Sequence, residues 1–255
     1  DGLAFYLTPD FSKINGSVIV GAMNQAFFTL STGMGGMAIF GSYIDKDHSL
    51  MGESVNVIVL DTFVAILAGF IIFPACSTYG LEVNAGPSLL FDTMASVFNH
   101  MAGGRIWGTM FFLFMIFAAL STVLGVCENI LAMVRELTGW SRPKGCIICG
   151  TGIFLLALTT ALGYSVIHFQ PFAEGTAWLD LWDFIVSNNV LPLGSLVLTL
   201  FCCNKFGWGW DNFITEADSG EGLKFPKALR FYCTYILPLI ILFIFVMGYW
   251  QKFFD

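Results

Sequence analysis

Six long apolar segments constrain this 255-residue chain more than any other feature of its sequence. Each is longer than the roughly 20 residues that an α-helix needs to cross a bilayer. Hydrophobic residues make up 56% of the chain and charged residues only 11%, whereas a soluble domain carries about 25% charged residues. The sequence therefore predicts an all-α polytopic membrane protein in a lipid bilayer. The composition argues against a disordered chain, a nucleic-acid binder and a cytosolic enzyme. The six segments are about Ser17–Tyr43, Glu53–Thr78, Arg105–Leu137, Pro143–His168, Leu179–Asn204 and Pro226–Trp250.

The stretch Tyr79–Gly104, between the second and third segments, contains turn residues and does not read as a span. We expect a re-entrant or surface hairpin there, with an amphipathic helix over Ser88–Met101. Lys and Arg residues divide three against eight between the two sides of the predicted membrane. The positive-inside rule places the side with eight in the cytoplasm. The hairpin and both chain ends then face outward, and an odd number of further helices is expected upstream.

Three glycines, Gly33, Gly35 and Gly36, lie in the middle of the first apolar segment. Glycine allows the backbone to leave the helical conformation. Unwound backbone at membrane depth persists only where it lines a cavity or binds a ligand. Hydroxyl groups adjoin the glycines at Thr29 and Ser31, and broken helices of this kind form substrate and ion sites in secondary transporters. The alternative interpretation is a helix-packing face made of small residues.

Two later segments carry polar groups that are costly inside a bilayer. Asp61 indicates a cation or a water-filled path, or else a hydrogen bond to a neighbouring helix. Ala118, Ser121 and Thr122 offer a carbonyl and two hydroxyls, which suit a small hard cation. Alternatively, both hydroxyls bond back to the preceding turn. Glu128 is a second carboxylate, and it is interpreted as a proton-carrying or gating group or as a packed, uncharged acid.

Other candidate groups give weaker signals. Asp180 and Asp183 lie at the outer mouth of the fifth segment, where an acid can close a gate by pairing with a base. Cys146 and Cys149 have the spacing of metal ligands, but no second pair follows, which favours inert thiols. The sequence contains no nucleophile–base pattern, P-loop or dinucleotide-binding motif. It therefore predicts neither an enzyme nor an organic cofactor.

Four motifs together resemble the neurotransmitter:sodium symporter family, specifically its bacterial amino-acid transporter branch. They are Gln25–Gly36 with Tyr43, Asp61–Pro74, Gly80–Pro87 and Ala118–Thr122. The resemblance covers essentially the whole chain, as one transmembrane unit, and begins just before the family's sixth helix. It implies the second inverted five-helix repeat of the family fold plus one extra helix, with the first helix broken mid-membrane. The five helices that precede this repeat in the family are then missing from the sequence and are expected partners of it.

The resemblance also implies a function: sodium-coupled symport of an amino acid or related small amine by alternating access. The expected location is the plasma membrane, specifically the inner membrane of a bacterium. Phe28 is similar to the family's aromatic lid above the substrate. The residues implied around the substrate are Phe28, Ser31, Gly33, Met34, Thr122 and Val126. Those implied for two sodium ions are Thr29 with Asp61, and Ala118 with Ser121 and Thr122. Those implied for gating are Asp183 on the outer side and Glu136 with its neighbour Tyr43 on the cytoplasmic side. Gln25, also implied for gating, resembles the family's polar residue near the chloride or acid position.

Asp61 also bears on chloride. Ala65 lies where chloride-dependent members of the family place a serine. We infer that Asp61 itself supplies the fixed negative charge, so that chloride is not needed.

Two other functions fit the same residues. One is a non-transporting membrane fragment or subunit that packs against partner helices. The other is a proton-coupled permease of the same fold, with Glu128 or Asp61 as the proton carrier.

Overall fold

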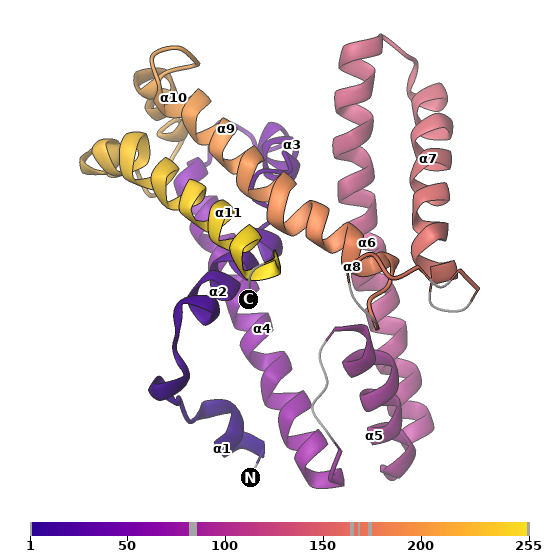
Figure 1. The fold of residues 1–255 in the computed structure, drawn as a ribbon. Coiled ribbons are helices and arrows are strands. Elements are labelled where there is room, and N and C mark those ends of the chain that lie inside the picture. Colours follow the sequence, from indigo (N-terminus) through magenta and orange to yellow (C-terminus); the bar gives the residue numbers. More distant parts are fainter. Residues whose placement is uncertain (1, 82–85, 164–165, 168, 173–174, 254–255) are drawn as a thin grey trace. The chain divides into compact units, whose positions relative to one another are not determined.

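The computed structural model describes residues 2–81, 86–163, 166–167, 169–172 and 175–253. This part of the chain is helical, apart from turns and one isolated parallel bridge between His48 and Glu221 (Figure 1). The α-helices are α1 (Gly2–Leu7), α2 (Gly16–Thr29), α3 (Gly36–Ser42), α4 (Leu50–Tyr79), α5 (Met94–His100), α6 (Gly104–Thr138), α7 (Arg142–Gly163), α8 (Trp178–Ile185), α9 (Leu191–Cys203), α10 (Trp210–Ala217) and α11 (Leu237–Phe253). Short 3₁₀ turns span Phe11–Lys13 and Lys227–Leu229, and π-helical turns span Leu89–Thr93, Val186–Val190 and Tyr232–Ile236.

Five helical segments in the described part are long and apolar enough to cross a membrane. They are Leu50–Tyr79, Gly104–Thr138, Arg142–Gly163, Trp178–Cys203 and Lys227–Phe253. The all-α, multi-pass prediction is therefore confirmed. The first predicted segment is not among the five, because its residues form the two short helices α2 and α3, of 14 and 7 residues.

The chain divides into two compact units. The first comprises the described parts of Asp1–Ile14 and Val57–Leu124, and the second comprises those of Asn15–Asn56 and Gly125–Asp255. Helices α4 and α6 each belong partly to the first unit and partly to the second. In the first unit α1 packs on α4, because the ring of Tyr6 lies over Gly69, and its hydroxyl donates to the carbonyl of Ile66 at 3.3 Å.

The second unit holds the interrupted helix. Within it α11 lies along α9, and α2 packs against both of them (Figure 1). Prolines shape two of these elements. The π-helical turn Val186–Val190 comes just before Pro192, and Tyr232–Ile236 comes just before Pro238. Because proline has no N–H group, it leaves a carbonyl of the preceding turn without its helical donor, which favours a locally widened turn.

The structure differs from the predicted helices at two places and agrees with the prediction at a third. The fourth segment was expected to reach His168, but α7 ends at Gly163, where Trp178 packs so closely that a Cβ atom on Gly163 would lie 2.7 Å from its ring. Residues 164, 165 and 168 lie outside the described residues. Helix α10 was not expected at all. In the predicted hairpin, residues 82–85 lie outside the described residues, and helical structure continues from Leu89 to His100 as expected.

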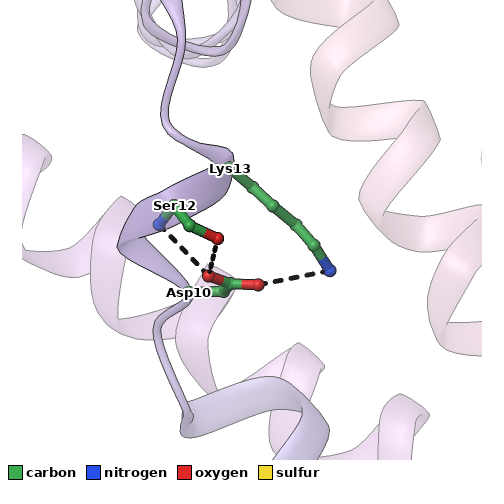
Figure 2. A network of polar contacts seen from close by, with 3 residues as sticks. All are labelled: Asp10, Ser12 and Lys13. Carbon is green, nitrogen blue, oxygen red and sulfur yellow. Dashed lines mark hydrogen bonds and ion pairs between the residues drawn. The ribbon is translucent and has the colours of Figure 1, made fainter.

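The 3₁₀ turn Phe11–Lys13 precedes the interrupted helix and begins with a polar cap. The Asp10 carboxylate accepts hydrogen bonds from the Ser12 hydroxyl at 2.5 Å and the Ser12 N–H at 3.1 Å, and Lys13 lies 3.4 Å away (Figure 2). The hydrogen bonds from Ser12, with a smaller contribution from Lys13, lower the pKa of Asp10 below its ordinary value. This turn is thus fixed by local contacts of an ionised aspartate.

Candidate functional site

The first apolar segment is interrupted as the sequence predicted. Helix α2 ends at Thr29, and α3 begins at Gly36. Between them Ser31, Gly33 and Gly35 have φ angles of +49°, +83° and +78°. These are left-handed values, which glycine adopts without strain and other residues rarely adopt. The non-helical backbone predicted for this stretch is confirmed for residues 30–35.

The break leaves backbone groups free to bind a ligand. The N–H groups of Ser31 and Thr32 still bond back to carbonyls of α2. Those of Gly33, Met34 and Gly35 have no hydrogen-bond partner within the described ranges of the chain. Unpaired amides are costly when buried, so a helix break with such groups needs water, protein or a ligand to complete it.

Helix α9 packs against the break at a glycine-to-glycine contact. A Cβ atom on Gly33 would lie 2.3 Å from the carbonyl oxygen of Leu191 and 2.6 Å from the N atom of Ser195. Conversely, a Cβ atom on Gly194 would lie 2.1 Å from the carbonyl oxygen of Gly33. Only glycine at both positions allows this approach. The buried hydroxyl oxygen of Ser195 has no partner among the described residues.

Helix α6 holds α3 through residues one turn apart. The Asn129 side chain donates to the Met34 carbonyl at 2.8 Å, at the start of α3. The Phe40 ring fills the space over Gly125, where a Cβ atom would lie 2.9 Å from it. Residues 125 and 129 lie on one face of a helix, so α3 docks on that face of α6.

A polar cluster closes the other end of α3. The Tyr43 hydroxyl donates to one carboxylate oxygen of Glu128 at 3.2 Å, and Arg142 pairs with the other at 2.8 Å. Glu128, which the sequence left open as a proton-carrying or gating group or as a packed, uncharged acid, thus forms an ion pair with Arg142. The sequence suggested Glu136 as the acid beside Tyr43. Glu136 is solvent-exposed, and the structure places Glu128 in that position.

The three groups predicted for the second sodium ion lie together but bond to one another. The Ser121 and Thr122 hydroxyls donate to the Ala118 carbonyl at 2.8 and 3.2 Å, and α6 is continuous there. The alternative of back-bonded hydroxyls is thus the arrangement observed. A sodium ion at these oxygens requires both hydroxyls to rotate away from the carbonyl.

The remaining predicted residues divide between the two units. Asp61 and the Ala118–Thr122 group belong to the first unit, and the residues of the break belong to the second. Phe28, in the last turn of α2, is 49% exposed. Gln25, Thr29, Val126 and Asp183 are exposed as well.

The two outer acids have different local roles. Asp183 accepts a hydrogen bond from the Ser187 hydroxyl at 2.8 Å. Asp180 accepts from the Ala177 N–H at 2.7 Å and so caps the start of α8. Asp180 therefore has a structural role, whereas Asp183 stays the predicted gating acid.

The long apolar helices define a multi-pass α-helical membrane protein. One of its helical segments is interrupted at glycines, between α2 and α3. The chain matches the model of the sodium:neurotransmitter symporter family over residues 1–253. It therefore belongs to that family, which is a family of symporters and not of enzymes.

Its relatives are bacterial and animal transporters. It is 32% identical over 252 residues to an uncharacterized sodium-dependent transporter of Haemophilus influenzae, covering 96% of this chain and 53% of that protein. An uncharacterized sodium-dependent transporter of Bacillus subtilis is 30% identical over 248 residues, covering 96% and 54%. The sodium-dependent serotonin transporter of Drosophila melanogaster is 26% identical over 272 residues, covering 98% and 41%. The chain thus spans about half the length of the bacterial relatives it matches.

Proposed function

We propose that this chain forms the C-terminal half of a transporter that couples inward movement of an amino acid, or a related small amine, to sodium entry by alternating access. The observation that carries the proposal is the break at residues 30–35, with its left-handed backbone and its free N–H groups. Family membership and the names of the relatives, all sodium-dependent transporters, support the sodium coupling.

The substrate is proposed to lie beside the break. Ser31, Gly33 and Met34 would line it, because the N–H groups of Gly33 and Met34, which have no partner among the described residues, can bind the carboxylate of a zwitterionic solute. Phe28 stands one turn earlier and half exposed, so its ring is able to move over a bound solute. Val126 of α6, in the same compact unit as the break, is proposed to complete the pocket and favours an apolar side chain on the substrate. Thr122 is a further substrate contact that the family resemblance predicts.

Two sodium ions are proposed, since sodium prefers oxygen ligands. The oxygens of Ala118, Ser121 and Thr122, which belong to one compact unit, would hold one of them. For the other ion, the family resemblance predicts Thr29 and Asp61 as ligands. Rotation of the two hydroxyls away from Ala118 would convert the observed back-bonded arrangement into a ligand set. The membrane potential adds about 2.3 kcal/mol per entering charge per 100 mV to the driving force.

The gates are proposed at opposite ends of the pathway. Asp183 would close the outer side, and Gln25 is a further gating residue that the family resemblance predicts. On the inner side, the Tyr43–Glu128–Arg142 cluster would hold α3 closed, and breaking it would release the solute. Glu136 remains a proposed inner gating acid.

Uptake by the full-length transporter that contains this sequence tests the proposal. Proteoliposomes would receive labelled leucine, methionine or alanine under an inward sodium gradient, and again with choline in place of sodium. We expect uptake of at least one amino acid that requires sodium. Uptake without sodium that follows a pH gradient would identify a proton-coupled permease instead, and no uptake in either condition would favour a non-transporting subunit.

A further inference from the structure

We propose that Asn129 is a positioning residue that sets the shape of the substrate pocket by fixing the Met34 carbonyl. The inference rests on the proposed function and assigns to α6 a role in selectivity. Asn129 lies on α6 in the second compact unit, as do the break and α3, so all contacts in the argument are within one unit. The side-chain N–H of Asn129 donates to the Met34 carbonyl oxygen at 2.8 Å in a partly buried setting.

The contact acts on the backbone at its most deformable point. Met34 precedes Gly35, whose φ of +78° makes it the left-handed residue at the start of α3. A Cβ atom built on Gly35 would lie 3.5 Å from the Asn129 side-chain oxygen and 3.7 Å from its nitrogen. The side-chain amide of Asn129 therefore lies next to the peptide group between Met34 and Gly35. Two glycines flank Met34, so nothing in the local chain fixes the orientation of its carbonyl.

Fixing this carbonyl also fixes the direction in which the Met34 side chain leaves the backbone. The peptide plane between Met34 and Gly35 is rigid. Its orientation is set by the ψ angle of Met34, and that angle relates the plane to the Cα–Cβ bond of Met34. The donor from Asn129 thus selects one direction for the Cα–Cβ bond of a residue proposed to contact the substrate. It also removes the Met34 carbonyl from the groups available to a solute.

Contacts of neighbouring α6 residues with α3 hold Asn129 in place beside the Met34 carbonyl. Glu128, the preceding residue of α6, binds Tyr43 at the far end of α3, and Gly125, one turn earlier, receives Phe40. Contacts at the start, middle and end of α3 hold it to one surface of α6. Of these, only the Asn129 contact reaches the break itself.

The test uses three variants of the full-length transporter. Asn129→Asp keeps the shape but removes the donor at neutral pH, Asn129→Gln keeps a donor on a longer side chain, and Asn212→Asp is the matched control. Asn212 makes the same kind of bond, to the Trp208 carbonyl at 2.8 Å, in the exposed helix α10. Uptake of labelled leucine and alanine gives KM and kcat. Hydrogen exchange of a peptide covering residues 30–40 reports on the break independently of transport.

We expect Asn129→Asp to raise the KM for leucine about five- to tenfold, the worth of one hydrogen bond, with a smaller change for alanine and little change in kcat. It should also speed exchange in residues 30–40, while Asn129→Gln restores both and Asn212→Asp changes neither. Unchanged exchange and an unchanged ratio of leucine to alanine KM in Asn129→Asp would overturn the inference.

The two proposals can fail separately. If the wild-type protein transports nothing, the proposed function fails, and the exchange measurement still decides the role of Asn129. If Asn129→Asp does not fold, Asn129→Leu and Asn129→Gln carry the same comparison. Equal exchange in wild type, Asn129→Gln and Asn129→Leu would then overturn the inference, and fast exchange in Asn129→Leu alone would support it.

Discussion

Replacement of Gly33 by alanine should destabilise the protein far more than the same change at Gly36. Alanine at the φ of +83° found at Gly33 costs about 1–2 kcal/mol. Its Cβ atom would also lie 2.3 Å from the Leu191 carbonyl oxygen, so the break and α9 must separate, which costs about 1–3 kcal/mol more. The total is about 2–5 kcal/mol. At Gly36 no heavy atom of the described residues lies within 4 Å of the Cβ position, apart from the adjoining residues and the backbone of α3 itself. Alanine there favours the helix slightly.

Gly194→Ala separates the two causes. Its backbone is helical, but its Cβ atom would lie 2.1 Å from the Gly33 carbonyl oxygen, so only the packing cost applies. Thermal unfolding of the detergent-purified transporter, followed by tryptophan fluorescence, measures all three variants. Each kcal/mol corresponds to about 2–4 °C for a domain of this size, so Gly33→Ala should lower the Tm by about 10 °C. Gly194→Ala should lie between Gly33→Ala and wild type, with Gly36→Ala at or above wild type. A Gly33→Ala protein as stable as Gly36→Ala would refute the reasoning.

Three further outcomes are expected. Thr122→Val should raise the sodium concentration for half-maximal uptake several-fold. Thr151→Val should not, although it loses the same kind of hydrogen bond from a hydroxyl to a carbonyl of the preceding turn, at 2.7 Å in α7. Equal effects of the two variants would indicate that Thr122 stabilises the helix and does not bind an ion. Sodium-dependent uptake should persist when gluconate replaces chloride and should become chloride-dependent or be lost in Asp61→Asn, so chloride dependence of the wild type would contradict the assignment. Hydrogen bonds from Ser12 lower the pKa of Asp10, so the Asp10 carboxylate should stabilise the 3₁₀ turn fully at pH values above the ordinary pKa of an aspartate. This stabilisation should be lost as the pH falls through the lowered pKa. A carboxyl ¹³C titration should give a low midpoint that Ser12→Ala raises, and no change in that variant would count against the cap.

The sequence predicted the break because glycine spacing is a local signal. Gly33 and Gly35 take left-handed φ angles, which few other residues tolerate, and the apolar context makes such a run unusual. The apolar lengths likewise predicted the spans. Helix α10 was missed because it has only eight residues, although Trp210, Phe213 and Ala217 have helical spacing that would have marked it.

What the sequence did not predict depends on packing between distant segments. The contact of Gly33 with Gly194 joins residues 161 positions apart and leaves no periodic trace. The Glu128–Arg142 pair depends on the turn between α6 and α7. Tyr43, predicted as the neighbour of Glu136, bonds to Glu128 of this pair. Asn129 was missed for the same reason, since an asparagine in an apolar helix has many possible partners and only the fold selects Met34.

An experimental structure of the full-length transporter, prepared with sodium and a transported amino acid, tests the central claim most directly. The account predicts density for the solute against Ser31, Gly33 and Met34, with the backbone of residues 30–35 still non-helical. It also predicts an ion at the Ala118, Ser121 and Thr122 oxygens, with the two hydroxyls turned away from the carbonyl. Solute bound elsewhere, beside a helix that runs unbroken through residues 30–35, would contradict it.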